Sequence, residues 1–176
     1  MKVTIKKRYI LCRGGEETVL PYSEVKDFVN GFAIVELNGK YGFIDKTVKE
    51  IVSPKYDYVS NFKNGFAGVG LNGKDGFIDE TGKEIAPLKY DYISDFKNGF
   101  VVVGLNGEYG CIDETGKEVV PLKYTLVQNY FDKGFALVRR NGKTFFVDET
   151  GKETVPPKNY LDYLDDSDNY SDVILF

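Results

Sequence analysis

Aspartate recurs at one position along the sequence, and a ladder of carboxylates is the first chemistry that these residues suggest. Carboxylate oxygens bind hard cations when several of them converge on one point. Neighbouring aspartates here are 34 or 35 residues apart, and each precedes a turn-forming segment such as Glu80-Thr81-Gly82-Lys83. Because Asp side chains hold backbone N–H groups in such turns, we interpret them as turn caps and expect no metal site and no cofactor. These residues are Asp45, Asp79, Asp113 and Asp148.

A second group of carboxylates lies near the C-terminus, where Asp166-x-Asp168 resembles part of a calcium-binding loop. The glycine and the later glutamate that such a loop needs are missing. We therefore interpret this segment as a solvated acidic loop. Its aspartates are Asp162, Asp165, Asp166, Asp168 and Asp172.

Tyrosine rings offer another chemistry, the binding of a sugar or a peptide. One position after each hairpin turn varies while its neighbours repeat, and it holds Tyr9, Tyr41, Asp75, Tyr109 and Thr144. A charge at Asp75 disfavours a fully buried position. Tyr58 and Tyr92 vary in the same way, since Leu126 takes their place in a later repeat. Aromatic pairing on a sheet surface is the alternative to a binding role. The candidate binding residues are Tyr9, Tyr41, Asp75, Tyr109, Tyr58 and Tyr92.

The residue types argue against catalysis. The chain contains no histidine, which removes the commonest general base and any Ser-His-Asp or Cys-His arrangement. Paired carboxylates still permit glycoside hydrolysis, but most carboxylates here occupy repeated turns or polar loops. Cys12 and Cys111 have no metal-ligand spacing, and we interpret both as small apolar residues without a disulfide.

These residues are organised by an internal repeat. Asn-Gly occurs at residues 38–39, 72–73, 106–107 and 141–142, and residues 38–71 share 24 of 34 identities with residues 72–105. A divergent first copy of the repeat begins at Met1. We therefore predict one domain of five units, over residues 1–30, 31–64, 65–98, 99–133 and 134–170, with a C-terminal strand over 171–176.

One unit shows the elements that must position the candidate residues. Residues 66–71 alternate as a strand, Asn72-Gly73 favours a type I′ hairpin turn, and residues 74–79 return as a second strand. Residues 84–90 form a third strand, and residues 91–98 are expected to be a loop. Recurring aromatic residues are expected to anchor the core between units. They are Phe32, Phe66, Phe100 and Phe135, and the tyrosines Tyr22, Tyr56, Tyr90 and Tyr124.

The predicted fold class is therefore all-β, a tandem repeat of β-meander units of about 34 residues. A single meander cannot bury its apolar face alone, so neighbouring units must stack. Both an open solenoid and a closed ring, such as a small propeller, satisfy this requirement.

The repeated text also resembles a known family. The pattern F-x-N-G-F-A-x-V-x-x-N-G-K-x-G-F-I-D-x-x-G-K-E-I-x-P-x-K-Y-D is similar to the bacterial WG repeat, also called the KWG repeat, with the best match over residues 28–56, 62–90 and 96–124. The family is named for Trp-Gly after the hairpin turn, but this chain has no tryptophan, and the glycine remains at Gly42, Gly76 and Gly110. The resemblance implies a β-rich repeat scaffold with an interaction function.

Charge and composition limit the partners. The formal charge is −4 and the pI is near 5.0, which disfavours nucleic acid, and no apolar run approaches the length of a membrane span. No signal peptide is visible in residues 1–13, so a cytoplasmic protein is expected. We predict a non-catalytic protein–protein interaction scaffold. A carbohydrate or cell-envelope binding module is the alternative, and a glycosidase-like enzyme is a weaker one.

Overall fold

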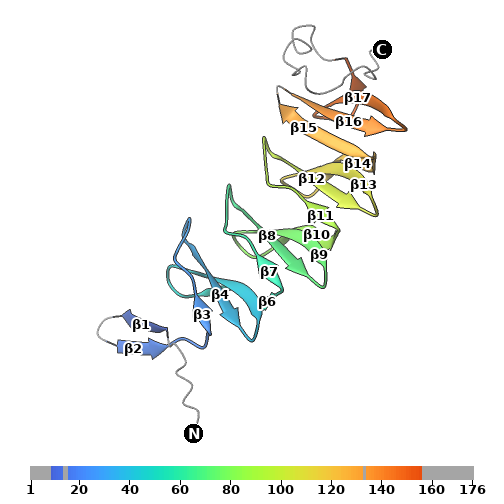
Figure 1. The fold of residues 1–176 in the computed structure, drawn as a ribbon. Helices are drawn as coiled ribbons and strands as arrows, with labels where there is room; N and C mark the ends of the chain where they lie inside the picture. The colour runs from blue at the N-terminus through green and yellow to red at the C-terminus, as the bar shows by residue number, and fades with distance from the viewer. Residues whose placement is uncertain (1–8, 14–15, 133, 156–176) are drawn as a thin grey trace. The chain divides into compact units, whose positions relative to one another are not determined.

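The computed structural model describes residues 9–13, 16–132 and 134–155, and every regular element in this described part is a β-strand (Figure 1). The chain divides into two compact units, Met1–Leu88 and Lys89–Phe176. The described residues include no helix long and apolar enough to cross a membrane. The predicted all-β tandem repeat is confirmed.

The strands form a two-stranded sheet followed by four-stranded sheets in chain order. The two-stranded sheet consists of β1 (Ile10–Arg13) and β2 (Glu16–Val19). The next consists of β3 (Glu24–Val25), β4 (Phe32–Leu37), β5 (Lys40–Asp45) and β6 (Glu50–Tyr56). After it come β7 (Tyr58–Val59), β8 (Phe66–Leu71), β9 (Lys74–Asp79) and β10 (Glu84–Tyr90). In the second unit lie β11 (Tyr92–Ile93), β12 (Phe100–Leu105), β13 (Glu108–Asp113) and β14 (Glu118–Tyr124). The last sheet consists of β15 (Leu126–Asp132), β16 (Phe135–Arg140), β17 (Lys143–Asp148) and β18 (Glu153–Thr154).

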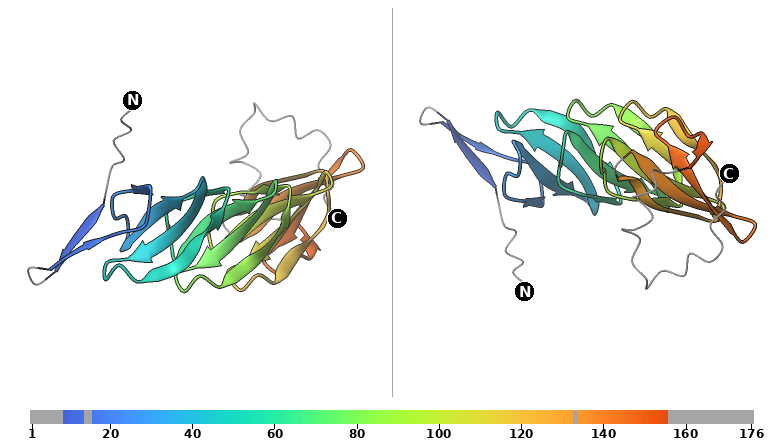
Figure 2. Two further views of the ribbon diagram at one scale, coloured as in Figure 1. Left: turned by 90° about the horizontal axis from the view of Figure 1, so that it is seen from below. Right: turned by 90° about the horizontal axis from the view of Figure 1, so that it is seen from above.

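Each four-stranded sheet is a meander in which consecutive strands pair. The predicted Asn-Gly turns have the backbone that type I′ requires, with a positive φ at both residues. Asn72 has φ 54° and Gly73 has φ 73°, for example. Within the first unit, Figure 2 shows the blue β1–β2 hairpin apart from the strands of the sheet that follows it.

The meander has one strand more than the sequence indicated. Residues 91–98, expected to be a loop, contain β11, and β3 and β7 occupy the same place in the first unit. In the first unit the backbone N–H of Asp57 bonds to the Gly70 carbonyl at 2.8 Å, and the Asp57 carboxylate accepts from the Asn72 N–H at 2.7 Å. A strand of two residues is too short to show a period of two in the sequence, so the loop prediction was wrong there.

A second Asn-Gly turn, at residues 30–31, 64–65 and 98–99, was also missed. Asn30 has φ 51° and Gly31 has φ 95°, and a β-bridge between Val29 and Phe32 closes this turn. The same bridge joins Lys63 to Phe66 and Lys97 to Phe100. The Asn-Gly pairs at 64–65 and 98–99 were visible in the sequence, but they lacked a long strand on their N-terminal side.

The core lies between consecutive sheets within each unit. In the first unit, one apolar cluster joins Ile34, Phe43 and Val52 of the sheet β3–β6 to Ala67 and Val69 of the sheet β7–β10. The opposite face of β4 and β5 packs with Tyr22 in a separate cluster. In the second unit, Val102, Cys111 and Val120 meet the sheet β15–β18 in the same way. A sheet that is buried on both faces explains the nearly continuous apolar runs of β4 and β12.

The recurring aromatic residues do pack between sheets, but their burial differs from expectation. The Phe32 ring lies 4.5 Å from Phe62, and the Phe100 ring lies 4.0 Å from Phe131, between ring centroids. These repeated phenylalanines are nevertheless only partly buried, because they stand at the start of a strand. The repeated tyrosines are the more deeply buried set: Tyr22, Tyr56, Tyr90 and Tyr124.

Several predictions fall on residues outside the described part. They are the C-terminal strand over 171–176, and the acidic residues Asp162, Asp165, Asp166, Asp168 and Asp172. The division into five units also stays a prediction.

Candidate functional site

The candidate tyrosines of two sequence positions lie in one row across each central sheet. Tyr92 in β11 pairs with Gly104 in β12, and Gly104 pairs with Tyr109 in β13. In the first unit, Tyr58, Gly70 and Asp75 are placed in the same register. The sequence presents these positions as two independent sets, and the hairpin register makes them one surface.

The glycine in the middle of the row makes room for the rings. A Cβ atom added at Gly70 would stand 2.0 Å from the Tyr58 ring, and one added at Gly104 would stand 2.9 Å from the Tyr109 ring. Sequence reasoning missed both glycines as parts of the site. A glycine in a strand interior is a known signal for close approach, and it was available in the Val-Gly-Leu text.

In the first unit the row is closed by a hydrogen bond. The Tyr58 hydroxyl donates to the Asp75 carboxylate. Partial burial, this hydrogen bond and the negative charge of Asp75 together raise the pKa of Tyr58 to about 12. Tyr58 is 50% exposed, so the pair lies on the surface with its polar groups satisfied by each other.

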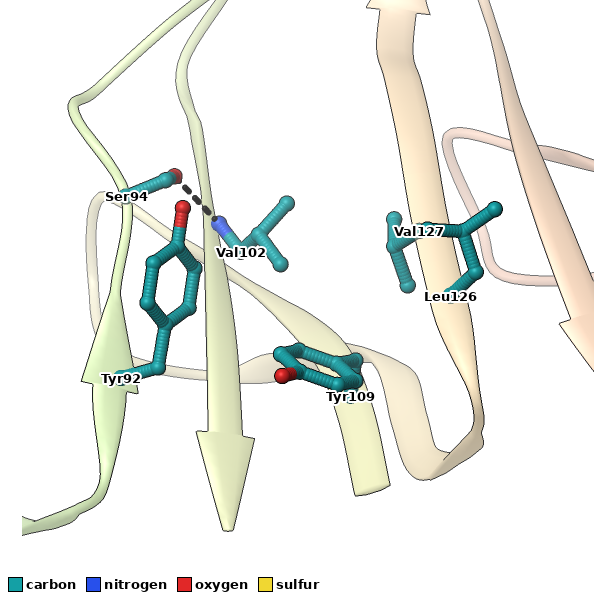
Figure 3. A pocket seen from close by; sticks show the side chains of 6 residues that line it. All are labelled: Tyr92, Ser94, Val102, Tyr109, Leu126 and Val127. Atoms are coloured by element: carbon teal, nitrogen blue, oxygen red, sulfur yellow. Dashed lines mark hydrogen bonds between the residues drawn. The ribbon is translucent and has the colours of Figure 1, made fainter. Parts of the chain in front are cut away.

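In the second unit tyrosine replaces the aspartate, and the row is open. The Tyr92 and Tyr109 rings are 5.9 Å apart between centroids and meet edge to face at 71°. Figure 3 shows both rings at a pocket whose other side is the strand carrying Leu126 and Val127. The pocket has a volume of about 330 Å³, which is at the small end of the range for ligand sites.

The lining of this pocket is uncharged. It comprises Tyr92, Ser94, Val102, Tyr109, Leu126 and Val127. The Ser94 hydroxyl oxygen accepts a hydrogen bond from the Val102 N–H at 3.0 Å, which fixes its position. Within the described part of the chain, the Tyr92 and Tyr109 hydroxyls have no hydrogen-bond partner. The pocket therefore combines apolar walls with phenolic O–H groups that are free to bind.

The other candidate residues lie in different surroundings. Tyr41 is half-buried opposite Glu36 and lies 5.7 Å from the Lys26 ammonium, measured to the ring centroid. Tyr9 is half-buried beside the hairpin β1–β2, and its carbonyl accepts from the Leu20 N–H at 2.8 Å. In the last sheet, the matching Thr144 is buried. Of the six candidates, the structure brings Tyr58 to Asp75 and Tyr92 to Tyr109.

Sequence reasoning also missed Ser94, Leu126 and Val127. Leu126 and Val127 belong to the sheet after the one that carries the tyrosines, so they join the pocket only through packing between sheets. The replacement of tyrosine by Leu126 was visible in the sequence, but its position against Tyr109 was not.

The repeated aspartates are turn caps, as predicted. One oxygen of Asp148 accepts from the Thr150 N–H at 2.9 Å, from the Thr150 hydroxyl at 2.6 Å and from the Lys152 N–H at 3.1 Å. Asp45, Asp79 and Asp113 make the same set of bonds. The threonine hydroxyl is the main reason that the pKa of Asp45 and Asp148 is lowered. No group of three metal-ligating side chains occurs among the described residues.

Cys111 is buried in the core of the second unit. Burial raises the pKa of its thiol to about 12, so the nucleophilic thiolate is scarce at neutral pH. The side chain of Cys12 lies outside the described part.

Comparison with known proteins gives a family match and distant structural likenesses. The family model described as "WG containing repeat" matches residues 16–41, 41–74, 76–109 and 109–143. No curated protein matches the chain significantly.

Solved structures similar to the chain include Kluyveromyces lactis Hsv2, at 11% identity and a TM-score of 0.43, covering 85% of this chain and 57% of that one. The tricorn protease matches at 14% identity and a TM-score of 0.35, covering 84% of this chain and 19% of that one. A variant of Hsv2 with its loop 6CD replaced by a Gly-Ser linker is covered over 47% of its length. The chain thus spans about half the length of the Hsv2 chains. At these TM-scores the likenesses carry no argument about function.

Proposed function

Because the chain belongs to the WG-repeat family, with consecutive repeats matched over residues 16–143, we propose that it is a non-catalytic module that binds a partner protein. Stacked repeats present a surface on which the positions that vary between repeats select the partner. Such positions lie on the tyrosine row, where Asp75 in one sheet becomes Tyr109 in the next.

The observation that carries this proposal is the pocket beside Tyr92 and Tyr109. Tyr92 is 46% exposed, although burial of a large aromatic side chain away from water is energetically favourable. Tyrosine is enriched at the centres of protein interfaces, because it offers apolar area and a hydroxyl at little entropic cost. A partner that covers Tyr92 and fills the pocket would bury this apolar area and could also form a hydrogen bond with the hydroxyl group.

The lining of the Tyr92–Tyr109 pocket supports a role without catalysis at this site. One carboxylate oxygen of each repeated aspartate accepts hydrogen bonds within its own turn, as at Asp148. The pocket is lined by tyrosine, serine and aliphatic residues, and no carboxylate pair stands in it. A glycosidase needs two carboxyl groups flanking one bond.

An affinity capture with a repeat-swapped variant tests the proposal. The full chain and Tyr109→Asp, which copies the residue of the preceding sheet, would be immobilised and exposed to lysate of the source organism. We expect a protein that is retained by the parent chain and lost by Tyr109→Asp. Bound proteins would be identified by mass spectrometry, and circular dichroism would show that the variant is folded.

A Glu108→Ala variant is the matched control, because adjacent strand residues face opposite sides of a sheet. Glu108 is exposed beside Tyr109, and its removal should leave capture unchanged. A partner that both Tyr109→Asp and the parent retain would show that the tyrosine row is not the interface. Retention of a glycan in place of any protein would favour a carbohydrate-binding module.

A further inference from the structure

We propose that the Tyr92–Tyr109 pocket binds a proline-rich segment of the partner, with one proline ring seated against the two tyrosine rings. This inference rests on the proposed function and specifies the partner's chemistry. Its basis is the lining of the pocket, the free hydroxyl groups and the contrast with the preceding sheet.

The lining suits a ligand that is apolar and uncharged. Val102, Leu126 and Val127 form aliphatic walls beside the two tyrosine rings. A proline ring fits this environment because it is apolar and its nitrogen carries no N–H that would be left unsatisfied. Aromatic-lined grooves are the usual receptors of proline-rich segments, which are already extended before binding and lose little entropy.

The hydroxyl groups match the polar part of such a segment. A polyproline backbone has carbonyl acceptors and no donors. The Tyr92 and Tyr109 O–H groups can donate to these carbonyls. The Ser94 hydroxyl is already engaged within the chain, because it accepts from the Val102 N–H at 3.0 Å and donates to the Asp95 carbonyl at 3.0 Å.

The same lining suits a sugar less well. A hexose presents many hydroxyl groups, and each needs a partner when it is buried. Charged and carboxamide side chains supply several bonds at once, but the pocket contains none of these types. With hydroxyl groups as its only polar side chains, it satisfies a few carbonyls better than a ring of hydroxyls.

The repeat itself shows how the site opens. In the sheet β7–β10, the Tyr58 hydroxyl is held by Asp75. One residue differs at the matching position of the sheet β11–β14, and Tyr109 leaves the hydroxyl of Tyr92 free. The variant Tyr109→Asp should restore the closed arrangement, because the neighbouring repeat already accommodates an aspartate there.

Titration of the full isotope-labelled chain with an octaproline peptide tests this inference by NMR spectroscopy. We expect amide shift changes confined to the residues of the pocket, and about tenfold weaker binding by Tyr109→Asp. Glu108→Ala should bind like the parent. Since the lining is uncharged, affinity should change little with added salt.

A second variant keeps the test decisive if Tyr109→Asp does not fold. If the spectrum of Tyr109→Asp loses its dispersion, Leu126→Lys places a charge on the opposite wall and should weaken binding without touching the tyrosines. The proline-binding site would be overturned by shift changes elsewhere on the chain. It would also be overturned if Tyr109→Asp and Leu126→Lys both bound octaproline as tightly as the parent chain.

The outcomes separate this inference from the proposed function. If octaproline causes no shifts while lysate capture still depends on Tyr109, the protein interaction stands and its proline chemistry is wrong. If a neutral hexasaccharide shifts the pocket residues and octaproline does not, the site binds carbohydrate and both proposals fail.

Discussion

The glycine that follows the variable hairpin position is required by close backbone packing. A Cβ atom at Gly42 would stand 2.3 Å from the Val52 carbonyl oxygen, and one at Gly110 would stand 2.4 Å from that of Val120. The register between β5 and β6 shifts at this point, as does that between β13 and β14. The glycine of the Trp-Gly pair is therefore required by a β-bulge, because the bulge brings the backbone of the third long strand directly over this residue. The residue before this glycine lies outside this contact, so its side chain can vary between repeats.

Replacement of this glycine should destabilise the fold. We expect Gly110→Ala to lower the free energy of unfolding by about 1–3 kcal/mol, because the backbone of β14 must move away from the new methyl group. Urea denaturation followed by circular dichroism measures this change. Glu114→Ala, in an exposed turn, is the control. A loss within about 0.5 kcal/mol, as for a surface substitution, would contradict the close approach.

The capped aspartates make stability depend on acid pH. The hydrogen bond from the Thr150 hydroxyl is the largest cause that lowers the pKa of Asp148 from its ordinary value of 3.8. A lowered pKa in the folded state means that the group stabilises the fold above the unfolded pKa, and that this contribution is lost as the pH falls through the folded pKa. We expect Thr150→Val to raise the pKa of Asp148 in an NMR titration of its carboxyl carbon. An unchanged pKa would show that the hydroxyl does not stabilise the carboxylate.

At the scale of elements, short turns connect one sheet to the next. The Asn30 side-chain amide donates to the Phe62 carbonyl at 2.8 Å, and Asn98 donates to the Phe131 carbonyl at 3.2 Å. Both asparagines have a positive φ, at 51° and 53°. A single asparagine thus closes a hairpin turn and also binds the backbone of the following repeat, at Phe62 in one case and at Phe131 within β15 in the other. The requirement for left-handed backbone and a side-chain donor together explains asparagine rather than glycine.

Two substitutions at Asn30 separate these roles. Asn30→Gly keeps the backbone conformation but removes the hydrogen bond, so it should cost about 1 kcal/mol of stability. Asn30→Ala loses the hydrogen bond and also strains the backbone, so it should cost about 1–2 kcal/mol more. Thermal unfolding of both variants measures the difference. Equal stability of Asn30→Gly and the parent would mean that the amide bond to Phe62 contributes nothing.

On the scale of the whole molecule, apolar burial is shared between consecutive sheets. Ile34 and Phe43 of one sheet are buried by Ala67 and Val69 of the next, and the second unit repeats this arrangement. Stability in such a chain is approximately a sum of contributions from repeats and their nearest neighbours. A sheet taken alone would leave one or both of its faces in water.

Removal of one whole period should therefore leave a folded protein. Deletion of residues 38–71 joins Leu37 to Asn72 and reproduces the natural Leu71-Asn72 junction. We expect a β-type far-UV spectrum, a cooperative transition and a smaller denaturant m-value, because less surface is exposed on unfolding.

Deletion of residues 38–61, which is not a whole period, is the control and should not fold. If the in-register deletion also loses its cooperative transition, the repeats are not interchangeable neighbours.

The sequence by itself determined the features that depend on local chemistry. The Asn-Gly turns, the capped aspartates and the long strands were predictable, because each depends on a few adjacent residues whose backbone preferences are strong. The repeat period predicted the tandem sheets. The charge at Asp75 indicated a position that is not fully buried, which holds for Asp75 itself but is wrong for Thr144 at the matching position of the last sheet. The short strands such as β11 could not be predicted, since two residues carry no periodicity.

Only the tertiary structure decided which distant positions share a surface. The hairpin register places Tyr92 beside Tyr109 over Gly104, and sheet packing brings Leu126 of the next repeat to the same pocket. It also decided that the Tyr58 hydroxyl donates to Asp75, whereas the Tyr92 hydroxyl has no hydrogen-bond partner among the described residues. These relations depend on strand register and on contacts between sheets, which no short segment of the sequence encodes.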